Sequence, residues 1–157
     1  MSENEEILWK GKPSQLINSN NFLLSGIVVL LIIILSIYLW GWLFYLIVFP
    51  CGYALQKWLI LRSYGYELTN ERLRVTTGIF TKSFEEIELY RIRDYSIVQP
   101  FFLRLFSLGN VILKTSDKTM PDVTITAIKD FMEVKDKIRA RVEILRKEKD
   151  IKEIDYT

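Results

Sequence analysis

The stretch that decides the fold is FLLSGIVVLLIIILSIYLWGWLFYLIVFPCGYALQKWLIL, from Phe22 to Leu61. Its forty residues include a single charged side chain, that of Lys57. One membrane crossing by an α-helix needs about 20 apolar residues, so the stretch is long enough for two crossings. It therefore predicts a transmembrane helical hairpin over residues 22–61, with helices at about 22–39 and 43–61.

Aromatic and basic side chains mark both ends of the predicted hairpin. At the turn, Trp40 and Trp42 flank Gly41, and indole rings prefer the membrane–water interface. At the other end, Lys57 lies one turn inside the second helix, beside Trp58, and its ammonium group can reach the headgroups. We therefore expect Trp40, Trp42, Lys57 and Trp58 to act as membrane anchors.

The second predicted helix contains Pro50, Cys51 and Gly52. Proline removes a backbone donor and glycine lacks a side chain, so this segment predicts a kink. Cys51 is the only cysteine, which excludes an intrachain disulfide and favours a packed thiol over a reactive or acylated one.

Positive charges are distributed asymmetrically around the hairpin. The turn carries none, whereas Lys10 and Lys12 precede the first helix and Arg62 follows the second. Lysine and arginine are retained on the cytosolic side, so we expect both termini to be cytosolic and residues 1–21 to form a juxtamembrane segment. The acidic start and the lack of a small-x-small cleavage site argue against a cleaved signal peptide.

After Leu61 the hydrophobic period changes to two, which is typical of half-buried strands. Charged residues lie between the apolar positions and predict an antiparallel sheet with one solvated face. A turn is expected at Thr69-Asn70-Glu71. The predicted strands cover residues 64–68, 72–77, 84–89, 92–98, 111–115 and 123–127.

An amphipathic helix ends the predicted domain. Its apolar stripe steps by three or four residues through Ile128, Phe131, Val134, Ile138, Val142 and Leu145. We expect the stripe to close one open end of a small barrel, because it must be buried against another element. The predicted fold class is thus an α+β membrane protein. It has the hairpin, a cytosolic barrel of six or seven antiparallel strands with its C-terminal helix over 62–146, and a charged tail over 147–157.

Three stretches of the soluble part resemble the bacterial membrane-anchored pleckstrin-homology-like family. They are YELTNERL at 66–73, followed by Val75 and Gly78-Ile79-Phe80; IELYRIRD at 87–94; and the run from Gln99-Pro100 through Arg104-Leu105-Phe106 to Leu108-Gly109-Asn110-Val111. The segment WKGKPS at 9–14 is similar to the one that precedes the first helix in many members. Ser107 departs from the pattern, since relatives often carry glycine there.

This resemblance implies a split β-barrel of pleckstrin-homology (PH) type in a multi-pass protein of the bacterial inner membrane. Members are often discussed as scaffold or envelope-stress proteins. The resemblance implies no particular activity, because a fold alone does not supply a function.

Four arginines are candidates for contact with a phosphate group, a lipid headgroup or a partner: Arg72, Arg74, Arg91 and Arg93. The members of each pair are two positions apart, so each pair would place two guanidinium groups on one strand face. Three nearby glutamates dilute the charge. The alternative interpretation is a solvated strand face with a structural role.

Residues 101–106, FFLRLF, form the most apolar stretch of the soluble part. Pro100 and Gly109 fit the two ends of a short helix. A helix this short buries only one side, so at least one of its three phenylalanines is expected to be more than half exposed. The segment is then either a contact surface for the membrane or a partner, or a plug of the barrel. The candidate contact residues are Phe101, Phe102, Arg104 and Phe106.

The composition argues against catalysis, metal binding and nucleic-acid binding. There is no histidine, which removes the commonest general base and the commonest metal ligand. No glycine-rich phosphate loop is present, and a net charge of +2 is too small to indicate a nucleic-acid partner. We expect no enzymatic activity, no cofactor and no metal.

Three functional hypotheses follow. The first is a non-enzymatic, membrane-tethered module that recruits or braces another membrane or envelope protein. The second is a lipid-sensing domain whose arginines read anionic headgroups. The third is a small protein that protects against membrane-active toxins through its hairpin.

Overall fold

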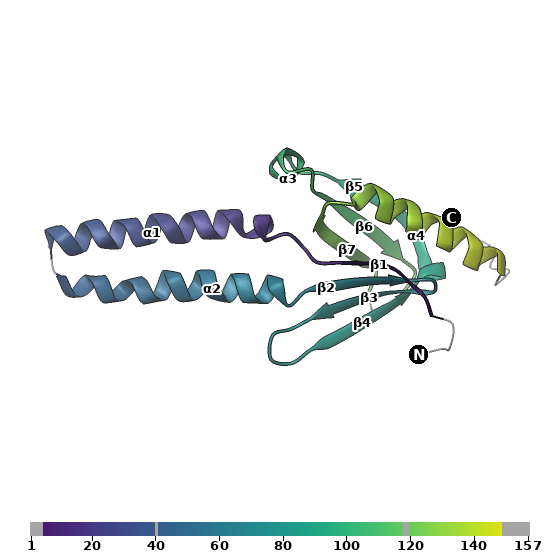
Figure 1. Ribbon diagram of the computed structural model, residues 1–157, viewed down its shortest axis with the longest axis horizontal. Helices are drawn as coiled ribbons and strands as arrows, with labels where there is room; N and C mark the ends of the chain where they lie inside the picture. The colour runs from purple at the N-terminus through teal and green to yellow at the C-terminus, as the bar shows by residue number, and fades with distance from the viewer. Residues whose placement is uncertain (1–4, 40, 118–119, 149–157) are drawn as a thin grey trace.

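The computed structural model describes residues 5–39, 41–117 and 120–148, and it has two visibly different parts (Figure 1). A pair of long helices projects from one end of a β-rich domain. The anchor predicted at Trp40 lies outside the described residues. So does most of the tail predicted at 147–157, namely the part from residue 149 onward.

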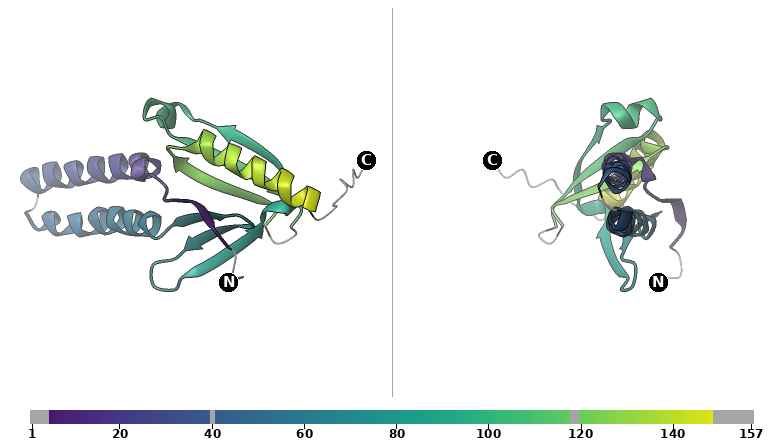
Figure 2. Two further views of the ribbon diagram at one scale, coloured as in Figure 1. Left: turned by 45° about the vertical axis from the view of Figure 1, so that its right-hand side comes forward. Right: turned by 90° about the vertical axis from the view of Figure 1, so that its left-hand side faces the viewer.

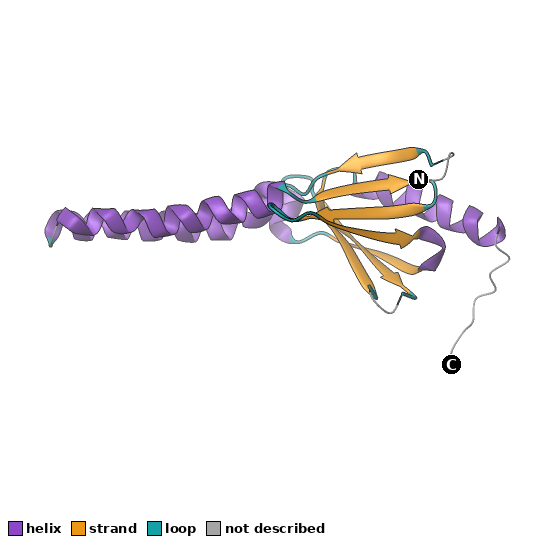
Figure 3. Cartoon of the chain, turned by 90° about the horizontal axis from the view of Figure 1, so that it is seen from below, coloured by secondary structure: helices purple, strands orange, loops and turns teal. Residues whose placement is uncertain are grey.

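The helical pair contains two antiparallel runs that lie side by side (Figures 1 and 2); seen from below, one run overlaps the other (Figure 3). The first consists of η1, a 3-10 turn at Gln15–Asn18, and α1 at Ser19–Tyr38; the second consists of η2, a 3-10 segment at Gly41–Ile47, and α2 at Val48–Arg62. Both runs are long and apolar enough to cross a membrane, and almost none of their residues are buried. Pro50 lies in the first turn of α2, where its missing N–H costs no helical hydrogen bond. The second run begins as the 3-10 segment η2 and continues as α2 through Pro50 and Gly52.

The domain contains two antiparallel sheets. The first has the order β1-β2-β3-β4, with bounds Ile7–Gly11, Gly65–Thr69, Arg72–Thr77 and Ser83–Glu88. The second has the order β5-β6-β7, with bounds Ile92–Val98, Gly109–Thr115 and Asp122–Ile128. A 3-10 turn, η3 at Leu89–Arg91, connects the two sheets, and α3 at Phe101–Leu105 connects β5 to β6.

Strand β1 was not predicted, and it changes how the two parts of the chain are related. It pairs antiparallel with β2, with Gly11 opposite Tyr66 and Ile7 opposite Thr69. The helical pair is therefore inserted into the connection between two neighbouring strands. Part of the predicted juxtamembrane segment 1–21 thus belongs to the sheet.

The C-terminal helix α4, Phe131–Glu148, closes the opening between the two sheets (Figure 2). Its buried stripe is Val134, Ile138, Val142 and Leu145. The Lys137 ammonium group donates to the Leu8 carbonyl of the first sheet (3.3 Å), and the Arg146 guanidinium donates to the Ile92 carbonyl of the second (2.6 Å). The predicted stripe is wrong at one position, because Ile128 ends β7 and the helix starts three residues later.

Candidate functional site

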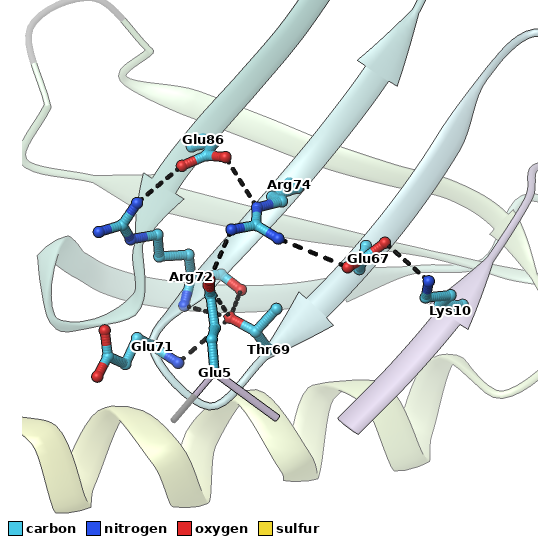
Figure 4. Close-up of polar contacts among 8 residues, drawn as sticks. All are labelled: Glu5, Lys10, Glu67, Thr69, Glu71, Arg72, Arg74 and Glu86. Atoms are coloured by element: carbon cyan, nitrogen blue, oxygen red, sulfur yellow. Dashed lines mark hydrogen bonds and ion pairs between the residues drawn. The ribbon is translucent and has the colours of Figure 1, made fainter. Parts of the chain in front are cut away.

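Arg72 and Arg74 share one face of strand β3, as predicted, and a carboxylate of β4 joins them (Figure 4). Arg72 Nη1 lies 2.9 Å from Glu86 Oε2, and Arg74 Nε lies 2.8 Å from Glu86 Oε1. Glu86 is placed there because it pairs directly with Arg74 in the register of β3 and β4. The same glutamate thus neutralises part of both positive charges.

The ion pairs continue across the face to strand β1 (Figure 4). Arg74 also contacts Glu5 at 2.6 Å and Glu67 at 3.6 Å, and Glu67 contacts Lys10 at 3.1 Å. With Arg72 and Glu86, the network contains three basic and three acidic side chains, so its formal net charge is zero.

The pKa shifts agree with this pairing. The Arg72 and Arg74 guanidinium groups hold the pKa of Glu86 below its ordinary value, against the opposing effect of burial. Burial would lower the pKa of Arg74, but its contacts with Glu86 and Glu5 raise it. An incoming phosphate would have to displace these carboxylates, so this face lacks the free cationic charge of a headgroup site.

Thr69 anchors the same network at the turn between β2 and β3. Its fully buried Oγ1 accepts a hydrogen bond from the backbone N–H of Arg72 (2.9 Å) and lies 2.9 Å from Glu5 Oε1. The hydroxyl therefore joins the turn to the chain that leads into β1. These contacts support a structural role for the Arg72 and Arg74 face.

The second predicted arginine pair does not form a common face. Arg91 belongs to the turn η3 and not to a strand, so the predicted alternation with Arg93 on β5 is wrong. Arg91 contacts Glu88 (3.0 Å) and Asp117 (3.1 Å), whereas the Arg93 side chain is exposed. The two guanidinium groups thus have different surroundings.

Helix α3 presents the exposed aromatic surface that its sequence predicts. Phe101 and Phe102 are 76% and 66% exposed, and their rings meet edge to face with centroids 5.7 Å apart. Leu103 is buried beside Leu108 and holds the helix on the domain, while Leu105 is exposed. The expected exposure is confirmed. Phe106 and Arg104 are exposed as well.

The end of α3 differs from the prediction. Gly109 does not end the helix but begins β6, where a Cβ atom would lie 2.7 Å from the Phe131 ring. The chain reverses instead at Ser107, which has a φ of +56°. Serine thus occupies a left-handed conformation that glycine adopts without strain.

A second apolar tip, which sequence reasoning did not single out, is the loop between β3 and β4. Phe80 in this loop is 100% exposed and Ile79 is also exposed. Gly78 has a φ of +102°, and a Cβ there would collide with the Thr81 carbonyl oxygen, so the loop requires glycine. The loop and α3 flank the helical pair at the end of the domain from which it projects (Figure 1).

Polar contacts hold the two helical runs together at this end. Gln15 Nε2 donates to the Trp58 carbonyl (3.2 Å), and the buried Asn18 donates to the Lys57 carbonyl (3.0 Å). Ser14 N–H donates to the Ala127 carbonyl of β7 (3.1 Å), which connects η1 to the second sheet. The hairpin is therefore joined to the domain by more than its covalent links.

The predicted anchors have exposed or half-buried positions along the hairpin. Trp42 is exposed at the start of η2. Near the domain, the Lys57 ammonium group lies 5.4 Å from the centre of the Tyr53 ring. The Arg62 guanidinium lies over the Trp58 ring, with its central carbon 4.7 Å from the centre of that ring. Basic and aromatic groups thus meet where α2 joins the domain.

No group of three or more metal-ligating side chains exists within residues 5–39, 41–117 and 120–148. Cys51 is exposed on α2. The exposed apolar tips at α3 and at the β3–β4 loop lie around the base of the helical pair.

No curated protein matches the chain. Among solved structures, a DUF1696-family protein with a pleckstrin-homology domain from Shewanella loihica PV-4 is 14% identical, with a TM-score of 0.44. The match covers 52% of this chain and 73% of that one. The model of the bacterial PH domain family matches residues 16–142. Because this match includes most of the chain, the protein belongs to the bacterial PH domain family.

Proposed function

We propose that the protein is a non-enzymatic, membrane-tethered interaction module of the bacterial inner membrane. Its hairpin spans the bilayer twice, both termini are cytosolic, and the PH-like domain recruits or braces another envelope protein at the membrane surface. PH domains are generally non-catalytic interaction modules and commonly bind lipids or proteins. Scaffolding during envelope stress is compatible with this role.

The exposure of the helical pair is the observation that carries the proposal. Leucine, isoleucine and valine side chains of both helices face outward, although the domain beside them has a well-buried core. Exposed apolar surface is unfavourable in water by roughly 25 cal/mol per Å². A bilayer removes this surface from water, whereas a core helix of a soluble protein would already be buried.

The charge distribution supports the proposed orientation. Lys12 and Arg62 lie at the domain end of the pair, while the turn beyond Tyr38 carries no charge. The positive-inside rule places the basic end in the cytosol. The domain is then cytosolic as well.

We further propose that α3 and the β3–β4 loop rest in the headgroup region on either side of the hairpin. Both tips are exposed and apolar, and both lie level with the base of the helices (Figure 1). Burying one phenylalanine ring contributes about 1.5–3 kcal/mol, so Phe80 and Phe102 together would hold the domain against the surface.

Cysteine accessibility tests the topology. In a Cys51→Ala background, we would place single cysteines at Gly41, in the turn, and at Ala140, on the exposed face of α4. A membrane-impermeant maleimide should label Gly41→Cys in intact spheroplasts and Ala140→Cys only after lysis. Labelling of Ala140→Cys in intact spheroplasts would overturn the proposed orientation.

An environment-sensitive fluorophore tests the membrane contact of α3. The same background with Phe102→Cys, labelled with nitrobenzoxadiazole, should show blue-shifted emission in proteoliposomes and quenching by spin-labelled lipids. A label at Ala140→Cys is the matched control and should show neither. An unquenched, water-like spectrum at position 102 would contradict the proposed membrane contact of α3.

The bracing role needs its own experiment. Crosslinking of the full-length protein in native membranes should give a discrete heteromeric product that copurifies in mild detergent. Recovery of the chain without any crosslinked protein would contradict this role. The lipid-sensing alternative based on the arginines loses support, since Arg72 and Arg74 are paired with carboxylates.

A further inference from the structure

Strand β4 is the outermost strand of the first sheet, and one of its edges is free (Figure 1). It pairs with β3 in a register that contains no bulge. The Leu89 N–H donates to the Glu71 carbonyl (2.9 Å), which continues this register by one pair. Hydrogen-bonded positions alternate in an antiparallel ladder, so the backbone groups of Phe84 and Glu86 point away from β3.

The other three edge strands are covered by groups of the same chain. A carbonyl of each accepts a hydrogen bond: from Lys137 at β1, from Arg146 at β5 and from the Ser14 N–H at β7. Among the residues that the structure describes, no group bonds to the outward backbone of Phe84 or Glu86. The edge of β4 is therefore open to pairing with another chain.

Side chains on the solvated face of this sheet alternate in charge from strand to strand (Figure 4). One row of directly paired residues consists of Lys10 on β1, Glu67 on β2, Arg74 on β3 and Glu86 on β4. Each member forms an ion pair with the next. The row ends at the free edge on a carboxylate, so a further strand would continue the alternation with a basic residue.

The neighbouring row on this face ends at the free edge on an aromatic ring. Phe84 lies opposite Thr76, and its side chain is 66% exposed. Residues two positions apart on a strand lie on the same face. In an added strand, the residue two positions from the basic one would therefore lie beside the Phe84 ring and would be apolar.

We propose that the free edge of β4 binds an extended segment of the partner protein. The segment places a basic residue opposite Glu86 and an apolar residue two positions away, beside Phe84. Main-chain hydrogen bonds to an edge strand provide affinity, and the alternating side chains provide specificity. This inference rests on the proposed function and deepens it by naming the surface that holds the recruited protein.

A second copy of this chain does not fit the edge. Identical strands that pair edge to edge about a two-fold axis run antiparallel. Because β4 runs away from the hairpin, the two hairpins would then point in opposite directions and could not span one bilayer (Figure 1). Such pairing would also bring the three glutamates of β4 close to those of the copy. The occupant is therefore a segment of another protein.

A peptide with the inferred pattern tests the edge directly. Isotope-labelled full-length protein in detergent would be titrated with acetyl-Thr-Thr-Arg-Thr-Val-Thr-amide and followed by NMR. Saturable shifts should be largest at the amides of Phe84 and Glu86, and these amides should exchange more slowly with solvent. The same peptide with glutamate in place of arginine should bind about threefold or more weakly. Equal affinities for the two peptides, or no shift at β4 at millimolar concentration, would overturn the inference.

Phe84→Pro and Phe84→Ala form a matched pair of variants. Both lose the ring, but only proline loses the outward N–H, and proline is tolerated on the free side of an edge strand. The arginine peptide should bind Phe84→Pro about threefold or more weakly than Phe84→Ala, because one main-chain hydrogen bond is lost. Equal affinities of the two variants would overturn the pairing.

Glu86→Gln replaces this pair if the proline variant does not fold. It removes the carboxylate that ends the row, so the preference for the arginine peptide over the glutamate peptide should fall by roughly threefold. An unchanged preference would contradict the proposed position of the basic residue.

Crosslinking in native membranes separates this inference from the proposed function. The heteromeric product expected from the wild type should persist in Phe84→Ala and be lost in Phe84→Pro. A product that persists in both variants would overturn the binding edge and leave the bracing role intact. Absence of the product from the wild type would contradict the bracing role itself.

Discussion

The Nη2 atom of Arg74 lies 2.6 Å from Oε2 of Glu5, although 69 positions of sequence separate the two residues. The Glu5 side chain is only 2% exposed. This contact ties the chain that enters β1 to strand β3, on the far side of β2. It is the closest ion pair of the network in Figure 4.

Replacing Glu5 by glutamine should therefore destabilise the domain. The substitution leaves a partly buried guanidinium without one of its carboxylates, at a cost of about 1–3 kcal/mol. Thermal unfolding of the full-length protein in detergent measures the effect. Glu85→Gln is the control, since Glu85 is exposed on β4 and forms no ion pair within the described residues. Equal Tm values for the two variants would show that the Glu5 contact is not stabilising.

The lowered pKa of Glu86 predicts a loss of stability in acid. Its hydrogen bonds from Arg72 and Arg74 hold the pKa below the ordinary value of 4.5. The stabilisation is therefore fully present above this ordinary value and is lost as the pH falls through the lower folded-state pKa. The Tm measured between neutral pH and strong acid should fall less steeply in Glu86→Gln than in Glu85→Gln. Parallel profiles would exclude this contribution.

Much of the fold was predictable because it depends on local periodicity. The alternation of Leu73 and Val75 with arginines places β3 correctly, and the stripe through Ile138 places α4. Strand β1 has five residues, and its pairing partner lies more than fifty positions away. No local pattern distinguishes so short a strand from an irregular segment, so it was missed.

The candidate site was predictable only in part. The exposure of Phe101 and Phe102 follows from the shortness of α3, which cannot bury both sides. The pairing of Arg74 with Glu5 depends on β1, which was not predicted. The sequence therefore did not show that Glu5 helps to neutralise the positive charge of the arginine face. Lys12 and Lys82 lie far apart in the sequence, and only the tertiary fold brings both to the lining of one cavity.

Ile138→Ala tests whether α4 is docked as the structure shows. Ile138 is completely buried between the sheets, so truncation should cost about 2–5 kcal/mol. Met132→Ala on the exposed side of the same helix is the control and should change stability by less than about 0.5 kcal/mol. Comparable unfolding of both variants in detergent would contradict the observed packing.

Ser107→Gly should stabilise the protein. The φ of +56° at Ser107 is unfavourable for a residue with a Cβ by roughly 1–2 kcal/mol, and glycine removes that strain. Part of the gain is offset by the greater freedom of glycine in the unfolded chain, which leaves an increase of about 0.5–1 kcal/mol. Ser96→Gly in strand β5, where no positive φ occurs, should instead lower the Tm. A lower Tm for Ser107→Gly would contradict the left-handed turn.

The pairing of β1 with β2 predicts which part of the chain folds without the hairpin. Because Gly11 lies opposite Tyr66, residues 15–63 can be replaced by a short Gly/Ser linker that joins the two strands. The linked domain should be soluble and should unfold cooperatively. A fragment of residues 64–148 alone lacks Leu8 and Trp9, which pack against the core, and should be less stable by about 2–4 kcal/mol.

Trp9 reports directly on this difference, since the other three tryptophans lie in the removed segment. Its emission in the linked domain should be blue-shifted and should change together with the circular dichroism during urea unfolding. Leu8→Ala in the linked domain is the matched variant and should move the urea midpoint toward that of the fragment. If the fragment and the linked domain unfold at the same midpoint, β1 adds no stability, and the sheet begins at β2. If Trp9 emission is already water-like before unfolding, the strand is not docked once the helices are removed.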